Sequence, residues 1–159
     1  MFPLSILMNM KMHRNTKKVQ EKGRKCILIS GDISYEGFCR EAVEKIIEEF
    51  GEINIMVNNS AVQFPRDDIE QITSEQLERT FRINIFSCFF FAKAVMKYFI
   101  KGDTIINSTA ETAYRGSHHL IDYSSTKGAI VSFTRSLSLA LVEKGIRING
   151  MPLARYGRL

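Results

Sequence analysis

The chain has 159 residues, of which 45% are hydrophobic and 25% charged, a balance that fits one globular domain and excludes a disordered chain. The formal net charge of +5 comes from the two ends, because residues 26–150 hold 13 basic and 16 acidic residues, which argues against a nucleic-acid-binding face. No apolar run is long enough for a membrane span. Cys26, Cys39 and Cys88 form no CxxC pair, which favours a reducing, cytoplasmic compartment and argues against a structural zinc site.

Apolar runs and helical periodicity alternate from residue 26 onward. The short run at 26–30 predicts a buried strand that stops at Gly31. A helical pattern follows from Ser34 to Phe50, with Ser34 as its N-cap and Gly51 just after its end. Residues 53–57 predict a second buried strand.

The same alternation continues to residue 149. Thr73 and Gln76 form a capping box that opens a long helix, which the pattern carries to about Ile100. Residues 104–108 predict a third strand, 123–143 a third helix, and 146–149 the beginning of a fourth strand. The order βαβαβαβ predicts an α/β fold with a parallel sheet and helices on both faces.

Polar residues stand at the ends of three predicted strands. They are Asp32, Asn58 with Asn59, and Ser108 with Thr109. Ligands of open parallel sheets bind at the carboxyl ends of the strands, so these clusters form a candidate site. Each cluster taken singly is better explained as an ordinary turn between a strand and a helix.

Tyr123 and Lys127 lie four residues apart in the third predicted helix, and therefore on one helix face. A free phenol has a pKa of about 10 and is therefore a poor acid or base at neutral pH. A fixed positive charge nearby favours the phenolate and lowers that pKa. The pair could therefore exchange a proton with a substrate hydroxyl or carbonyl oxygen, although a surface pair explains the same spacing.

Six motifs occur in one order and spacing that resembles the short-chain dehydrogenase/reductase family. They are GDI (31–33), VNNSA (57–61), IN (83–84), IIN (105–107), YSSTKGA (123–129) and GIRIN (145–149). The resemblance covers residues 17–150 and is strongest to the bacterial branch of general-stress and glucose-dehydrogenase-like oxidoreductases. It implies a Rossmann-like, doubly wound parallel sheet.

The resemblance also implies where a nicotinamide dinucleotide, NAD or NADP, would bind. Asp32 takes the position that contacts the adenine, and Asn59, Ser60 and Ala61 pass the adenosine side of the cofactor. Asn58 is expected to brace neighbouring strands.

Three further residues take catalytic positions by resemblance. Tyr123 would be the acid/base, and Lys127 would lower the pKa of the phenol and bind the nicotinamide ribose. Asn84 would lie at the helix kink that holds a proton-relay water.

No metal is expected. The partners implied are a small-molecule alcohol or carbonyl substrate and a second copy of the chain, bound through the long helices as a homo-oligomer, with neither nucleic acid nor membrane.

Two departures from the family pattern bear on activity. The catalytic serine of the family lies thirteen residues before the tyrosine, and Ala110 stands there. The first strand, the Gly-rich turn that binds the pyrophosphate and the first helix have no counterpart, so a partial sheet is expected. The function expected by descent is alcohol/ketone interconversion, weak or lost in this chain. The alternative is a non-catalytic pseudogene remnant, or an interaction partner of an intact relative.

The two ends differ in character from the rest and suggest a shift of reading frame. One possible coding string for residues 152–159, moved by one base, reads PGPIWTP, which resembles the segment after GIRVN in the family. A similar shift near residues 7–16 gives NEYEDA. We therefore expect residues 1–16 and 151–159 to be out-of-frame segments that flank a partial domain at 17–150.

Overall fold

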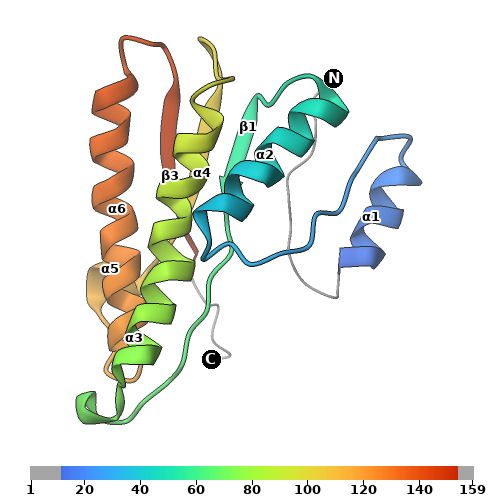
Figure 1. Ribbon diagram of the computed structural model, residues 1–159. Helices are drawn as coiled ribbons and strands as arrows, with labels where there is room; N and C mark the ends of the chain where they lie inside the picture. Colours follow the sequence, from blue (N-terminus) through green and yellow to red (C-terminus); the bar gives the residue numbers. More distant parts are fainter. Residues whose placement is uncertain (1–11, 154–159) are drawn as a thin grey trace.

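The computed structural model describes residues 12–153, and its centre is a three-stranded parallel sheet (Figure 1). The strands are β1 (Ile55–Asn58), β2 (Thr104–Ala110) and β3 (Arg147–Leu153), in the order β1-β2-β3. In register, Asn58 lies opposite Asn107, and Ala110 lies opposite Leu153. The predicted α/β class with a parallel sheet is confirmed.

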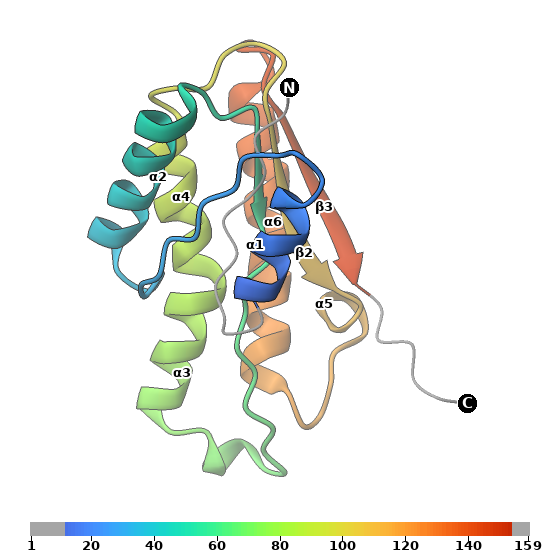
Figure 2. The ribbon, with the colours of Figure 1, turned by 90° about the vertical axis from the view of Figure 1, so that its right-hand side faces the viewer.

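Helices connect the strands. Their bounds are α1 (Met12–Gln20), α2 (Glu36–Phe50), the 3-10 turn η1 (Ile69–Gln71), α3 (Ser74–Phe81), the π-helical turn η2 (Arg82–Phe86), α4 (Ser87–Val95), α5 (Thr112–Arg115) and α6 (Ile121–Leu141). The helices α2, α4 and α6 lie on one side of the sheet, and α1 stands beyond the β1 edge of the sheet (Figures 1 and 2). None of the helices in the described part of the chain is both long and apolar enough to cross a membrane.

The main core fills the space between the sheet and these three long helices. Ile105, the second residue of β2, is completely buried, and Val43 of α2, Val95 of α4 and Ile130 of α6 pack in the same cluster. Such burial is the main source of stability, at about 25 cal/mol for each Å² of apolar surface. The core therefore holds α6 firmly against β2, which fixes the relation between the two elements that carry the candidate site.

The predicted strand at 26–30 is wrong, because these residues have no regular secondary structure. A strand needs the backbone donors and acceptors of a neighbouring strand, and β1 pairs only with β2 among the described residues. Ile29 is nevertheless buried. The other residues of the run are partly or fully exposed, so the apolar run predicts burial correctly only at Ile29.

Helix caps were predicted with mixed success. Thr73 Oγ1 accepts a hydrogen bond from the backbone N–H of Gln76, as the capping box requires. Gly51 ends α2 with a φ of 82°, a conformation that glycine adopts without strain. Ser34 does not cap α2, because the helix begins at Glu36 and Tyr35 takes the N-cap position.

The predicted boundaries of the domain meet the limits of the described residues. Residues 1–11 and 154–159, which hold most of the two expected out-of-frame segments, lie outside them. Residues 151–153 complete β3 beside β2. The frame-shift interpretation stays a prediction.

Candidate active site

Polar side chains gather where β1 and β2 end. Asn58 Nδ2 donates to Asn107 Oδ1 at 2.8 Å, and Asn107 Nδ2 donates to Thr134 Oγ1 of α6 at 2.9 Å. The prediction that Asn58 braces neighbouring strands is therefore confirmed. One step further along β2, Ser108 Oγ donates to Asn59 Oδ1 at 2.7 Å. These bonds connect the carboxyl ends of both strands to each other and to α6, and they define one wall of the candidate site.

Lys127 extends from α6 to the end of β2. Its Nζ donates to the backbone carbonyl of Ser108 at 2.8 Å and lies 5.5 Å from the ring centroid of Tyr123. Only 3% of the surface of Lys127 is exposed to solvent. The structure therefore brings Tyr123, Lys127, Ser108 and Asn59 together at one point of the sheet edge.

Burial sets the ionisation of this pair. Desolvation raises the pKa of Tyr123 above its ordinary value, and desolvation also lowers the pKa of Lys127, with a smaller opposing effect from Cys88. The expected lowering of the phenol pKa by Lys127 is therefore absent from this structure. The Lys127 ammonium lies over the ring, 5.5 Å from its centroid, and hydrogen-bonds the backbone carbonyl of Ser108. Tyr123 is consequently a neutral phenol at neutral pH.

Asn84 lies in the π-helical turn η2, so the predicted kink is present at its predicted residue. Its side chain holds the segment after β1, because Oδ1 accepts from Val62 N–H at 2.8 Å and Nδ2 donates to the Val62 carbonyl at 2.9 Å. Nδ2 also donates to Thr126 Oγ1 at 3.1 Å, and Thr126 Oγ1 donates to the carbonyl of Tyr123 at 2.7 Å. Asn84 is thus linked to the Tyr123 backbone through one hydroxyl.

The backbone carbonyl of Asn84 accepts a hydrogen bond from the Cys88 thiol at 3.4 Å. Burial raises the pKa of Cys88 to about 11, with a smaller opposing effect from Lys127, so the thiol keeps its proton at neutral pH. At the kink where the resemblance places a relay water, the backbone carbonyl of Asn84 therefore accepts a hydrogen bond from a side chain of the same helix.

Asp32, Ser60 and Ala61 complete the predicted cofactor residues, and all three are exposed. Asp32 Oδ1 accepts from Ser34 N–H at 2.9 Å. That bond is the main cause that holds the pKa of Asp32 below its usual value, and Arg79 adds a smaller effect. Asp32 stands apart from the Tyr123–Lys127 pair, with which no contact is seen among the described residues.

Ala110 ends β2 and is buried. Neither neighbouring hydroxyl replaces a serine there. Ser108 points to the same face but is bonded to Asn59. Thr109 points to the opposite face, where its methyl group is 3.6 Å from the position that a Cβ would take on Gly150. Its hydroxyl has no hydrogen-bond partner within residues 12–153.

Sequence reasoning missed the residues beneath Tyr123. Asp122 is only 2% exposed, and it accepts hydrogen bonds from the Tyr123 backbone N–H, from Gln76 Nε2 and from Thr80 Oγ1. The available signal is an acidic residue in the first turn of a helix, directly before the candidate acid/base. The capping box accounts for the backbone of Gln76 and says nothing of its side chain.

Metal ligation finds no support in the part of the chain that the structure describes, which contains no group of three or more His, Cys, Asp or Glu side chains able to hold an ion.

Comparison with known proteins gives concordant matches. The model of the short chain dehydrogenase family matches residues 5–154. The uncharacterized oxidoreductase YhdF of Bacillus subtilis is 50% identical over 135 residues, which cover 85% of this chain and 47% of that protein. General stress protein 39 of Bacillus subtilis is 49% identical over 135 residues, with the same shares, and glucose and ribitol dehydrogenase of Daucus carota is 47% identical over 125 residues, covering 79% and 43%.

Solved structures show the same fold. A short-chain dehydrogenase/reductase (glucose/ribitol dehydrogenase) from Brucella melitensis superposes with a TM-score of 0.84 at 26% identity, covering 95% of this chain and 63% of that one. A short chain dehydrogenase from Burkholderia cenocepacia J2315, solved in complex with NADP, gives a TM-score of 0.88 at 22% identity, covering 94% and 62%. The chain spans about half the length of the curated relatives it matches.

Proposed function

The chain belongs to the short-chain dehydrogenase family, and from that premise we propose that it binds a nicotinamide dinucleotide, NAD or NADP, and interconverts an alcohol and a carbonyl compound slowly. The observation that carries the proposal is the buried ammonium of Lys127, 5.5 Å from the ring of Tyr123 at the carboxyl end of β2. A buried charge without a carboxylate partner is costly, and such groups concentrate at functional sites.

The residues present fit the ribose of the dinucleotide next to the nicotinamide. An ammonium has three donors, and Lys127 Nζ has one hydrogen-bond partner among the described residues, so it can bind ribose hydroxyls. The exposed segment 59–61 begins at Asn59, which Ser108 holds next to this lysine. The bound dinucleotide would supply or accept the hydride.

Tyr123 would supply the proton. Because burial raises its pKa, it is protonated at neutral pH and acts most readily as a general acid, which favours carbonyl reduction. Its O–H bond breaks as the substrate oxygen gains the proton, and the phenolate left behind lies beside the Lys127 ammonium.

Cofactor binding tests this proposal directly. The chain has no tryptophan, so the fluorescence of NADH or NADPH can be followed on titration without protein background. We expect saturable binding by the intact chain and at least about tenfold weaker binding by Lys127→Met, which corresponds to about 1.4 kcal/mol. Lys97→Met, which changes an exposed lysine, is the matched control and should bind as the wild type does. If neither dinucleotide, oxidised or reduced, binds saturably, the proposal is wrong.

The alternative is that the chain is a non-catalytic remnant, or a partner of an intact relative. Ala110 favours it, because the hydroxyl that would polarise the substrate carbonyl is missing. It predicts that no dinucleotide binds and that the chain associates through its helices, so the titration above separates the two.

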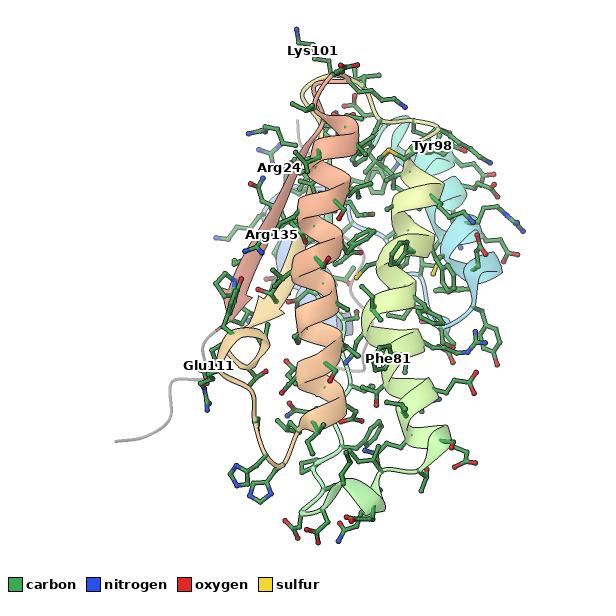
Figure 3. The ribbon with its side chains drawn as sticks, turned by 90° about the vertical axis from the view of Figure 1, so that its left-hand side faces the viewer. Arg24, Phe81, Tyr98, Lys101, Glu111 and Arg135 are labelled. Atoms are coloured by element: carbon green, nitrogen blue, oxygen red, sulfur yellow. The ribbon has the colours of Figure 1, made fainter. Side chains whose placement is uncertain are left out.

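Self-association through the long helices is the partner proposal. Figure 3 looks onto α6 and α4, which lie side by side. A groove of about 530 Å³ between them is lined by Ile85, Phe89, Ala129, Ser132, Phe133, Ser136, Leu137 and Ala140. An apolar surface of this kind on a helix pair is typical of a contact between copies.

A further inference from the structure

Asp122 has an unusually complete set of partners for a buried carboxylate. Oδ1 accepts from the backbone N–H of Tyr123 at 2.8 Å, and Oδ2 accepts from Gln76 Nε2 at 3.1 Å and from Thr80 Oγ1 at 2.8 Å. Gln76, Thr80 and Asp122 are all buried. The Tyr123 and Gln76 N–H groups can only donate, so both carboxyl oxygens of Asp122 act as acceptors. Thr80 Oγ1 has one proton and also lies 2.8 Å from the backbone carbonyl of Gln76, so it joins Asp122 to the α3 backbone.

The network has a direction that begins at the surface. Arg66 Nε donates to Gln76 Oε1 at 2.8 Å, and a guanidinium can only donate, so this bond fixes which end of the Gln76 amide is the oxygen. The amide nitrogen must then donate, and it does so to the Phe64 carbonyl at 3.3 Å and to Asp122. The exposed Arg66 therefore determines the hydrogen bonds that reach the buried Asp122.

The start of α6 depends on this carboxylate. Leu120 is the N-cap residue and provides no side-chain bond, although the first N–H groups of a helix have no partner within it. Asp122 serves the N–H of Tyr123, and its negative charge lies in the first turn, where the helix dipole favours it. The position of the phenol thus follows from how Asp122 is held.

The loop after β1 is joined to the same point. The backbone N–H of Arg66 donates to the carbonyl of His119 at 3.0 Å, just before α6 begins. The backbone of Arg66 is therefore bonded to His119, just before α6, and its side chain is bonded to Gln76 of α3. The network connects the segment that follows Asn59–Ala61, the helix α3 and the first turn of α6.

We propose that Asp122 is a positioning residue for Tyr123, held in place by a directed network that runs from Arg66 through Gln76. It acts through the first turn of α6 and touches no reacting atom. The inference rests on the proposed function only in taking the Tyr123 phenol as the reacting group, and its test uses neither cofactor nor substrate.

The test follows the Tyr123 phenol by NMR of protein labelled with ¹³C at the tyrosine Cζ, with the signal assigned by its loss in Tyr123→Phe. Asp122→Asn turns an amide N–H₂ toward Gln76 Nε2, and two donors then face each other. We expect this variant to move the Tyr123 signal and to shift its titration midpoint down toward the value of about 10 of an exposed tyrosine, as the phenol becomes more hydrated. Arg66→Met should change the chemical shift and the titration midpoint of Tyr123 in the same direction, by smaller amounts.

Two controls separate positioning from general destabilisation. Asp103 is also a buried aspartate, and it accepts from the backbone N–H of Ile100 and from Asn54 Nδ2 at the other end of β2. Asp103→Asn should lower the melting temperature without moving the Tyr123 signal. Arg82, which bonds Glu78 on the helix surface, gives the control Arg82→Met for Arg66→Met.

A rescue variant tests the direction of the network. In Asp122→Asn combined with Gln76→Glu, the acceptor moves to position 76 and can receive both Arg66 and the new amide. We expect this double variant to restore most of the wild-type titration midpoint of Tyr123.

The proposal is overturned if Asp122→Asn and Arg66→Met leave the Tyr123 signal where their controls leave it, or if the rescue variant has the same midpoint as Asp122→Asn. If Asp122→Asn does not fold, Arg66→Met at the exposed end of the network decides the question. Absence of dinucleotide binding would count against the proposed function and not against this result.

Discussion

Lys127 carries a positive charge in a place that few lysines occupy. It is almost fully buried, its Nζ bonds a backbone carbonyl, and no carboxylate pairs with it among the described residues. Burial in such a setting destabilises the charged form and lowers the pKa of the amine. Because folded and unfolded chains then hold the proton differently, this one side chain makes stability depend on pH.

The sign of that dependence can be measured with Lys127→Met. Between the lowered pKa of the folded lysine and about 10.4, the unfolded chain binds more protons, so this group makes the free energy of unfolding rise with pH. Burial raises the pKa of Cys39 to about 12 and that of Cys88 to about 11, and these thiols act in the opposite direction in both proteins. We therefore expect the difference in unfolding free energy, wild type minus variant, to increase from neutral pH toward about pH 10 in urea titrations. A difference that is flat over this range would show that the amine is hydrated in the folded chain.

Ala110 gives the second test at this scale. Ala110→Ser places a hydroxyl at the end of β2, on the face of the strand that Ser108 shares. If the chain turns over, one donor to the developing oxyanion should raise kcat by on the order of 10²–10³. The rate of carbonyl reduction at saturating NADPH or NADH measures it. Thr109→Ala, which removes the hydroxyl on the opposite face, should leave the rate unchanged, and an equal effect of both substitutions would contradict the assignment.

The sequence predicts some of the site residues and not others, and the difference has a physical reason. Tyr123 and Lys127 share a helix, so their spacing alone predicts their proximity. Asp122, Gln76 and Arg66 come from three segments, and their bonds depend on how α3 and α6 pack. Contacts of that kind are set by tertiary structure and leave no periodic signal in the chain.

Secondary structure elements show the same division. The helix starting at Thr73 and the glycine after α2 were predicted because caps are local, and the π-helical turn at Asn84 was placed by resemblance and not by periodicity. The run at 26–30 failed as a strand because a strand depends on its neighbour, and none pairs with it among the described residues.

The cap of α3 can be tested by itself. Thr73→Ala removes the oxygen that accepts from the Gln76 backbone N–H at 3.2 Å, so one donor at the helix start loses its partner. We expect a loss of about 1 kcal/mol in unfolding free energy from urea denaturation. Thr73→Ser keeps the hydroxyl and should retain most of the stability. Equal losses in the two variants would mean that the methyl group, and not the hydrogen bond, stabilises this turn.

On the scale of the whole molecule, the three long helices leave two kinds of apolar surface. One is the groove between α4 and α6, where the rings of Phe89 and Phe133 lie 4.4 Å apart. The other is the sheet, where Met151 and Leu153 of β3 are about half exposed. Sequence periodicity predicted helices that bury one face, and it could not show which apolar residues the fold would leave uncovered.

The groove makes a definite prediction about association. Ser136 lies in the groove and is exposed, so Ser136→Glu should leave the folded chain intact while it places a carboxylate at the contact between copies. A charge buried without a partner costs several kcal/mol, so we expect association to weaken at least about 100-fold, measured as mass by light scattering across a dilution series. Leu139→Glu makes the same change of charge on α6 at a residue that is 78% exposed and outside the groove. If association depends on the groove, only Ser136→Glu dissociates the chain, whereas dissociation by both variants would point to nonspecific apolar contact, and a monomeric wild type would refute the proposal.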